Sequence, residues 1–231
     1  MNTLPQVEPA IEPAIPSNIV YPDSDGQPMS DNTKQFRWIV TIKENLELLF
    51  ANREDVFVAG DLLWYPVEGS NTIRQAPDVM VVMNRPKGDR GSYKQWNEDN
   101  VAPQVVFEIL SPGNRLAEMV KKFKFYERYG VQEYYVYDPD DIELTGWLRT
   151  ESELEGISNS LDWVSPALGI RLIMGQAELE IYRPDGQKFL TFLELGQRAE
   201  SERQRAESER QRAESAEALL ARYREQFGEL L

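Results

Sequence analysis

The sequence predicts an α/β domain, and three features of residues 104–138 predict it. The stretch begins with a short apolar run, rich in β-branched side chains, that ends at Leu110 and is typical of a strand. A Ser-Pro-Gly-Asn turn then leads into a helical segment over about 116–129. Gly130 stands at the C-cap position, and a second buried strand is predicted at 133–137. Strand, helix and strand in this order form the building unit of an α/β sheet.

Residues before this unit are predicted to form one helix and two strands. Apolar side chains recur near helical spacing over residues 33–51, which predicts an amphipathic helix. The run 56–65 is predicted to be a strand with a bend at Gly60, and Asp61 is its one charge. A very short strand follows over 77–82, and its proline removes a backbone donor at the strand entrance.

The part after Asp138 is predicted to be mostly β-structure. The run 143–149 predicts a strand, and Pro-Asp-Gly at 184–186 predicts a hairpin turn. Residues 189–195 would close the domain. Weaker strand patterns, which would extend the sheet or form a small β-layer, cover 154–157, 170–174 and 178–182.

These patterns divide the chain into three parts. Residues 1–29 are rich in proline and have little apolar periodicity, which predicts a disordered arm. Residues 30–196 contain the predicted domain. From residue 197 a seven-residue repeat begins, in which alanine is the apolar residue and the other positions are dense in Arg and Glu. This repeat predicts a long charged helix over 197–231 that forms a weak coiled coil, if any.

Composition limits the chemistry that the protein can perform. The 231 residues include no histidine and no cysteine. Zinc sites, thiol nucleophiles, Ser–His hydrolysis and histidine general bases are therefore excluded. Catalysis must depend on carboxylates, lysine, tyrosine or serine, and any metal must be a hard cation bound by oxygen ligands.

Compartment and charge give further expectations. No signal peptide and no apolar run of the ~20 residues that would span a bilayer is present, so we expect a cytoplasmic protein with no membrane segment. The formal net charge of −14 argues against nucleic-acid binding, which needs clustered cations. Two local basic patches oppose that argument. A loop contributes Arg85, Lys87, Arg90 and Lys94, and the helix after it contributes Arg115, Lys121, Lys122, Lys124 and Arg128.

Two acids and one lysine could form a site. Asp78 begins one predicted strand, Glu108 lies inside the next, and Lys122 lies on the helix that follows. A carboxylate within a core strand is costly unless a partner compensates its charge. The simpler alternative is that Glu108 lies on an exposed face and Lys122 on a solvated one. Carboxylates from neighbouring strands can bind Mg²⁺, however, and a nearby lysine can assist attack on a phosphodiester.

The same residues resemble a known family. The sequences PDVMVV, VVFEILSPGNR, KFKFY and GVQEYYVYDP, in this order, are similar to those of the Uma-two family. That family belongs to the PD-(D/E)XK superfamily of restriction-endonuclease-like proteins. The resemblance extends from about Ser30 to Leu195. It implies a mixed central β-sheet flanked by helices, and a phosphodiesterase site that requires Mg²⁺ or Mn²⁺.

The resemblance also implies roles for single residues. Asp78 matches the motif aspartate and Glu108 the motif glutamate, so both would bind the metal. The superfamily pattern places a lysine two residues after the glutamate, where this chain has Leu110. In this family the lysine lies on the following helix, which makes Lys122 the candidate and Lys124 the alternative. Further candidate ligands are Asp61 on the preceding strand and Glu44 or Glu47 on the first helix.

These expectations favour a Mg²⁺-dependent endonuclease that acts on DNA, with loop 85–94 contacting phosphates. A homodimer is expected by analogy, because two cuts in a duplex need two sites. The alternative is a nuclease-like fold without catalysis that binds proteins through its acidic surface and C-terminal helix. A two-carboxylate glycosidase is a third hypothesis, since Trp64, Trp96 and Trp147 could stack on sugar rings.

Overall fold

The first of two compact units contains a six-stranded sheet. The computed structural model describes residues 19–26, 30–158 and 161–228, and the first unit ends in the sequence at Phe189. The strand order in the sheet is β1-β3-β5-β6-β7-β8. These strands are β1 (Val56–Gly60), β3 (Val79–Met83), β5 (Val105–Ile109), β6 (Glu133–Asp138), β7 (Glu143–Thr150) and β8 (Glu153–Gly156).

The sheet is mixed, and its one parallel pair lies at the predicted strand–helix–strand unit. β5 and β6 pair in parallel, while the other neighbouring strands pair antiparallel. Parallel neighbours need a long crossover, which α2 (Leu116–Arg128) provides. Gly130 follows this helix with a positive φ of 90°, which suits the predicted C-cap glycine. The unit predicted over residues 104–138 is therefore confirmed.

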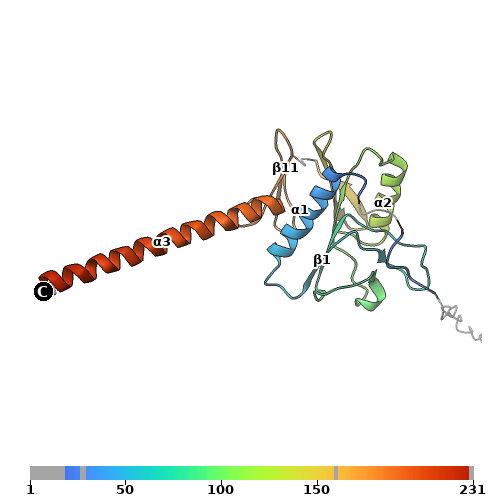
Figure 1. Cartoon of the computed structure of the whole chain (residues 1–231). Coiled ribbons are helices and arrows are strands. Elements are labelled where there is room, and N and C mark those ends of the chain that lie inside the picture. The colour runs from blue at the N-terminus through green and yellow to red at the C-terminus, as the bar shows by residue number, and fades with distance from the viewer. Residues whose placement is uncertain (1–18, 27–29, 159–160, 229–231) are drawn as a thin grey trace, which may run out of the picture. The chain divides into compact units, whose positions relative to one another are not determined.

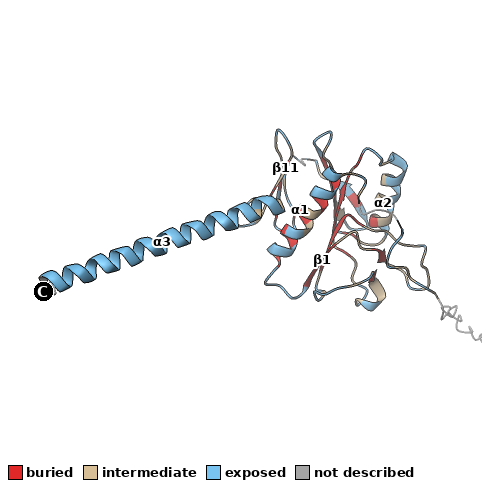
Figure 2. Cartoon of the chain, viewed as in Figure 1, coloured by how far each residue is buried: buried red, intermediate tan, exposed pale blue. Residues whose placement is uncertain are grey.

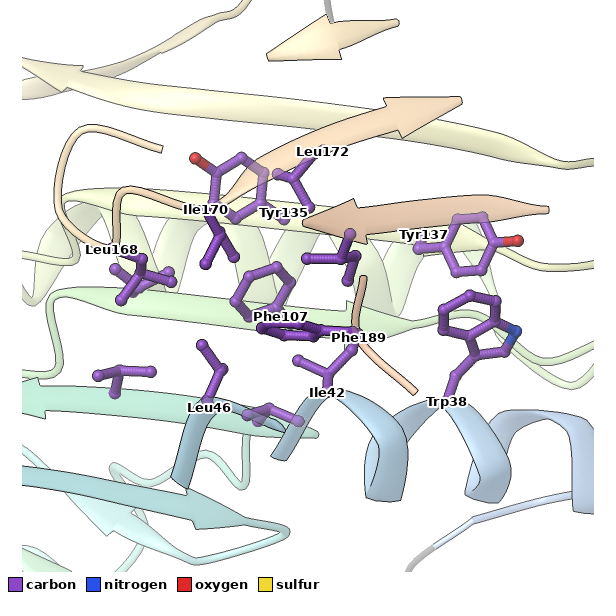
Figure 3. Packing of buried hydrophobic residues seen from close by; sticks show 14 of the residues in the cluster. Trp38, Ile42, Leu46, Phe107, Tyr135, Tyr137, Leu168, Ile170, Leu172 and Phe189 are labelled. Atoms are coloured by element: carbon purple, nitrogen blue, oxygen red, sulfur yellow. The ribbon is translucent and has the colours of Figure 1, made fainter. Parts of the chain in front are cut away.

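One face of the sheet packs against α1 (Thr33–Leu49). The helix begins where the Asn32 side chain accepts a hydrogen bond from the backbone N–H of Gln35. The spacing of its buried residues matches the prediction of an amphipathic helix. Figure 3 shows three of them, Trp38, Ile42 and Leu46, beside Phe107, Tyr135 and Tyr137 of the sheet and Leu168, Ile170, Leu172 and Phe189 further along the chain.

A small antiparallel sheet belongs to the same core. It contains β9 (Asp162–Val164), β10 (Arg171–Met174) and β11 (Leu179–Tyr182), in the order β11-β10-β9. Leu172 and Ile181 bury their side chains in the cluster that α1 covers. The small β-layer predicted from the weaker strand patterns is thus present, although β8 belongs to the main sheet.

The other face of the sheet packs against α2. Tyr126 is buried together with Met80, Val106 and Tyr134, which point to this face of the strands. Trp64 joins the same cluster and its ring lies parallel to that of Tyr126. Figures 1 and 2 show α1 and α2 around the sheet, with the buried residues concentrated between them.

The strand predicted over residues 56–65 is interrupted, which corrects that prediction. β1 ends at Gly60, and Asp61 has a positive φ of 48°. This left-handed conformation is uncommon for residues other than glycine, and it turns the chain out of the strand. The chain then continues as β2 (Trp64–Tyr65).

The polar segment 85–100 contains structure that its composition did not predict. β4 (Tyr93–Lys94) pairs in parallel with β2, and the short 3₁₀-helix η1 (Gln95–Asn97) follows it. Tyr93 is fully buried and its hydroxyl donates to the carbonyl of Val101 at 2.7 Å. One aromatic side chain therefore anchors this loop.

Residues 19–26 lie against the β2–β4 pair, rather than extending from the domain as a disordered arm would. The Tyr65 hydroxyl donates to the Pro22 carbonyl at 2.6 Å, and the backbone N–H of Gly69 donates to the Tyr21 hydroxyl at 2.7 Å. The remainder of the predicted arm falls outside the described residues.

The second unit contains α3 (Phe192–Phe227), which confirms the predicted long C-terminal helix. The helix begins earlier than residue 197 because Thr191 and Glu194 form a capping box. Its polar side chains form the predicted pairs along the helix, for example between Arg198 and Glu202 at 3.1 Å. Among the described helices, none combines the length and the apolar character needed to cross a membrane.

Candidate active site

Three acids lie side by side because of the register of three neighbouring strands. β1, β3 and β5 pair antiparallel, and their register brings Asp61 beside Asp78 and Asp78 beside Glu108. The backbone N–H of Asp61 donates to the Asp78 carbonyl at 3.3 Å, and that of Ile109 donates to Asp78 Oδ2 at 2.6 Å. Because side chains alternate along a strand, Asp78 and Glu108 lie on the sheet face that α2 covers.

Both oxygens of Glu108 are held by donors from α2. Lys122 Nζ lies 2.6 Å from Oε2, and the Tyr126 hydroxyl donates to Oε1 at 2.5 Å. The two donors are four residues apart and therefore lie one above the other on one helix face. Glu108 is only 2% exposed, so these bonds compensate a charge that burial would otherwise make costly. The helix lysine does reach the strand glutamate.

Asp78 carries a charge that its surroundings disfavour. It is 7% exposed, and burial, reinforced by the nearby Glu108 carboxylate, raises its pKa well above the usual value. The Lys122 ammonium and the Ile109 N–H oppose this rise only in part. Two buried carboxylates therefore share one lysine, and an added cation would relieve their repulsion.

The pKa values of Lys122 and Asp61 are also shifted by burial and by neighbouring carboxylates. Burial lowers the pKa of Lys122, but attraction to Glu108 and Asp78 outweighs it, so the pKa is raised and the ammonium stays charged. Burial raises the pKa of Asp61, and the carboxylates of Asp25 and Glu108 raise it further. Asp61 thus belongs to the electrostatic group around Asp78, at its solvent side.

The donor set fits a hard divalent cation of the Mg²⁺ type. Asp78 and Glu108 offer carboxylate oxygens, and Mg²⁺ in proteins commonly takes one or two carboxylates and keeps several waters. Within the described residues no group of three or more acids has the geometry to hold a metal. The buried hydroxyl of Tyr134, on the same face, has no hydrogen-bond partner among the described residues. Such a group is normally satisfied by water or a ligand.

Glu44 and Glu47 are not brought to this group. Both lie on α1, which packs against the opposite face of the sheet, and both pair with Lys43 at 3.0 Å and 2.9 Å. The structure thus joins three of the predicted site residues, Asp78, Glu108 and Lys122, with Asp61 next to them.

The basic loop uses most of its cations internally. Arg90 donates to Glu98 at 2.7 Å and its guanidinium lies 3.9 Å from the centre of the Phe57 ring. Arg85 pairs with Glu98 and Asp99. The two lysines of the loop also contact other residues: Lys87 donates to the carbonyls of Phe50 and Ala51 after α1, and Lys94 lies over the Tyr21 ring. Lys124, outside the loop, is exposed on α2.

Tyr126 and Tyr134 are the residues of the site that sequence reasoning did not select. The spacing of Lys122 and Tyr126 did place both on one helix face, which was the available signal for Tyr126. Tyr134 lies in an apolar strand beside two other tyrosines, and nothing in that pattern distinguishes it from an ordinary core residue.

Comparison with known proteins identifies the family of the chain. The model of the Uma2 family, described as "Putative restriction endonuclease", matches residues 24–198 of the 231. A solved structure described as "a putative nuclease belonging to DUF820", from Anabaena variabilis, is 17% identical with a TM-score of 0.44, over 60% of this chain and 75% of that one. No curated protein matches the chain. Because the family model covers well over half of the sequence, the chain belongs to the Uma2 family.

Proposed function

We propose that the protein is a Mg²⁺-dependent endonuclease that hydrolyses phosphodiester bonds in DNA. The family description supports nuclease activity. One observation carries the assignment of residues: Glu108 on the sheet meets Lys122 on the helix at 2.6 Å, directly beside the buried Asp78. Asp78 and Glu108 would bind Mg²⁺, or Mn²⁺ in its place, and Asp61 would contribute from the solvent side.

In the proposed hydrolysis, Lys122 and Tyr126 would have different roles. A bound divalent cation supplies a Lewis acid that polarises the phosphodiester and makes water a better nucleophile. Lys122 would orient the attacking water and stabilise the negative charge that develops on the phosphate oxygens. Tyr126 would keep Glu108 in one orientation, so that the carboxylate does not have to reorganise during the reaction.

The proposed partner is DNA. The proposed compartment is the cytoplasm. The cations Lys121, Lys124 and Arg128 are exposed on α2, the helix that carries Lys122. They are therefore better candidates for phosphate contacts than Arg85 and Arg90, which pair with acids of their own segment. Lys94 would contribute from β4. A homodimer is also proposed, because cutting both strands of a duplex needs two sites.

Calorimetric titration with Mg²⁺ and Mn²⁺, paired with a plasmid-nicking assay, tests this function. Wild type should bind one of the two ions and nick, and Asp78→Asn and Glu108→Gln should lose both properties. Glu44→Gln, on the opposite face of the sheet, is the matched control and should retain both. A wild type that binds neither ion and leaves the plasmid intact would refute the proposal.

A second candidate is a nuclease-like interaction module without catalysis. Lys122 and Tyr126 already occupy both oxygens of Glu108, and no group of three acids among the described residues could hold a metal. Both features suit a site that is complete without an ion. In this case Asp78→Asn would change no activity, and partners would bind through the acidic surface or α3.

A further inference from the structure

One face of α3 has bulky apolar residues at both ends and alanine and glutamate residues between them. Along this face, which we call the α3 seam, residues recur at alternating steps of three and four, the spacing of a coiled coil. Three of the four bulky side chains are exposed, Phe192 by 85%, Leu220 by 50% and Tyr223 by 57%, and Leu195 is half-buried. Figure 2 shows α3 exposed along nearly all of its length. Up to Tyr223 the seam consists of Phe192, Leu195, Ala199, Glu202, Ala206, Glu209, Ala213, Ala216, Leu220 and Tyr223, and Phe227 at the end of α3 continues the same spacing beyond it.

We propose that the α3 seam binds the α3 seam of a second copy of this chain, with the two helices antiparallel. In an antiparallel coiled coil, each residue at one seam position faces a residue at the other position of its partner. A single alignment then matches every member of the seam. It pairs Phe192 with Tyr223, Leu195 with Leu220, Ala199 with Ala216, Glu202 with Ala213 and Ala206 with Glu209.

Charge favours the antiparallel orientation. In a parallel, in-register pair each residue faces its own copy, so that Glu202 would meet Glu202 and Glu209 would meet Glu209. Two like charges in a partly buried layer are costly. In the antiparallel pair each glutamate faces an alanine, which leaves room for the carboxylate to reach water. The charge of Glu202 is also offset within its own helix by Arg198 at 3.1 Å.

Side-chain size selects the register. The proposed alignment places the bulky residues at the start of one helix against those at the end of the other. A shift by one repeat would set Phe192 against Ala216 and leave Leu220 and Tyr223 facing no residue of the seam. Packing of large against large and small against small keeps the helices in contact over the full seam.

The pattern also favours a second copy over a different protein. A two-fold symmetric interface must be complementary to itself, so each contact has to occur twice. The α3 seam has this property, because its first half matches its second half when the helix is reversed. The proposal goes beyond the nuclease function and does not depend on it, since it concerns residues outside the candidate active site.

Cysteine cross-linking tests orientation and register, because the chain contains no natural cysteine. Ala199→Cys and Ala216→Cys are prepared separately, one with a size tag, and oxidised alone and as a mixture. The mixture should give a cross-linked heterodimer, whereas each variant alone should give several-fold less dimer. In the antiparallel pair two copies of residue 199 lie about 25 Å apart along the axis, far beyond disulfide range. Cross-linking of each variant with itself would overturn the antiparallel assignment.

Light scattering on the full chain tests association itself. Wild type should be dimeric, and Leu220→Glu, which places a charge in the seam, should shift it to monomer. Ala218→Glu is the matched control: it adds the same charge two residues away on the outer face of the helix and should leave the dimer intact. Circular dichroism checks that both variants keep α3 helical. A monomeric wild type, or equal loss of dimer in both variants, would refute the proposal.

Discussion

Lys122 on α2 and Glu108 on β5, which are 14 residues apart in the chain, meet at 2.6 Å in a site that is almost closed to solvent. The lysine is the cation nearest to two buried carboxylates, and it is therefore required both for their charge balance and for the proposed chemistry. Its position on α2, rather than two residues after Glu108, does not prevent contact.

Replacing Lys122 by methionine is expected to reduce nicking about a hundredfold or more, the size of effect typical of a positioned proton-transfer or charge-stabilising group. The apolar stem is kept, but Glu108 loses its ion partner. Single-turnover nicking at saturating Mg²⁺ measures the effect. Lys188→Met, at a lysine that pairs with Glu180 at 2.9 Å outside the candidate site, is the control and should stay within a few-fold of wild type. Equal effects of the two variants would contradict a specific role for Lys122.

Asp78→Asn is expected to stabilise the protein in the absence of metal. The pKa of Asp78 is raised in the folded state, so the folded protein binds its proton more tightly than the unfolded chain does. The associated stability is complete below the unfolded pKa of about 4 and is lost as the pH rises through the folded value. An asparagine cannot ionise, so the variant does not lose this stability as the pH rises, and its side-chain oxygen can still accept from the Ile109 N–H.

Thermal melts of this variant and of wild type, with a chelator present, measure the difference. We expect a melting temperature a few degrees higher for the variant at pH 8, corresponding to about 1 kcal/mol or more, and no difference near pH 3. Asp55→Asn is the control, because Arg53 lowers the pKa of that exposed acid and its removal should not stabilise. A variant less stable than wild type at pH 8 would contradict the electrostatic account.

Tyr126→Phe is expected to lower the free energy of unfolding by about 1–2 kcal/mol and to weaken activity about tenfold. The ring and its packing on Trp64 remain, but the hydroxyl that donates to Glu108 is lost. Denaturant melts measure the first effect and plasmid nicking the second, and a Mn²⁺ titration shows whether the carboxylate still binds metal. Tyr129→Phe, whose ring packs on Phe125 and Trp64, is the control. Unchanged Mn²⁺ affinity and activity would show that Tyr126 does not position the carboxylate.

Arg90→Ala is expected to act on stability more than on DNA binding. Arg90 holds Glu98 with two nitrogens, at 2.7 Å and 3.2 Å, and covers the Phe57 ring, so its loss should cost about 2 kcal/mol in unfolding free energy. Lys124→Ala should leave the melting temperature unchanged and should lower the salt dependence of DNA binding by about one phosphate contact. The reverse result would restore the basic loop as the DNA-binding surface.

Sequence by itself determined the fold class and three members of the candidate site. Local patterns were sufficient for α1, for the β5–α2–β6 unit and for the C-terminal helix, because helical spacing, apolar runs and glycine at a C-cap depend on near neighbours. Asp78, Glu108 and Lys122 were selected because each is a polar residue that an apolar segment or a motif singles out.

Tertiary structure decided how those residues meet and which others join them. Strand register brings Asp61 and Asp78 beside Glu108, and only the folded chain places Tyr126 and Tyr134 near that carboxylate. The sequence predicts that loop 85–94 contacts phosphates, whereas in the structure its two arginines pair with Glu98 and Asp99. Hydrogen bonds and ion pairs between residues far apart in sequence depend on the packing of whole elements, which no local pattern encodes.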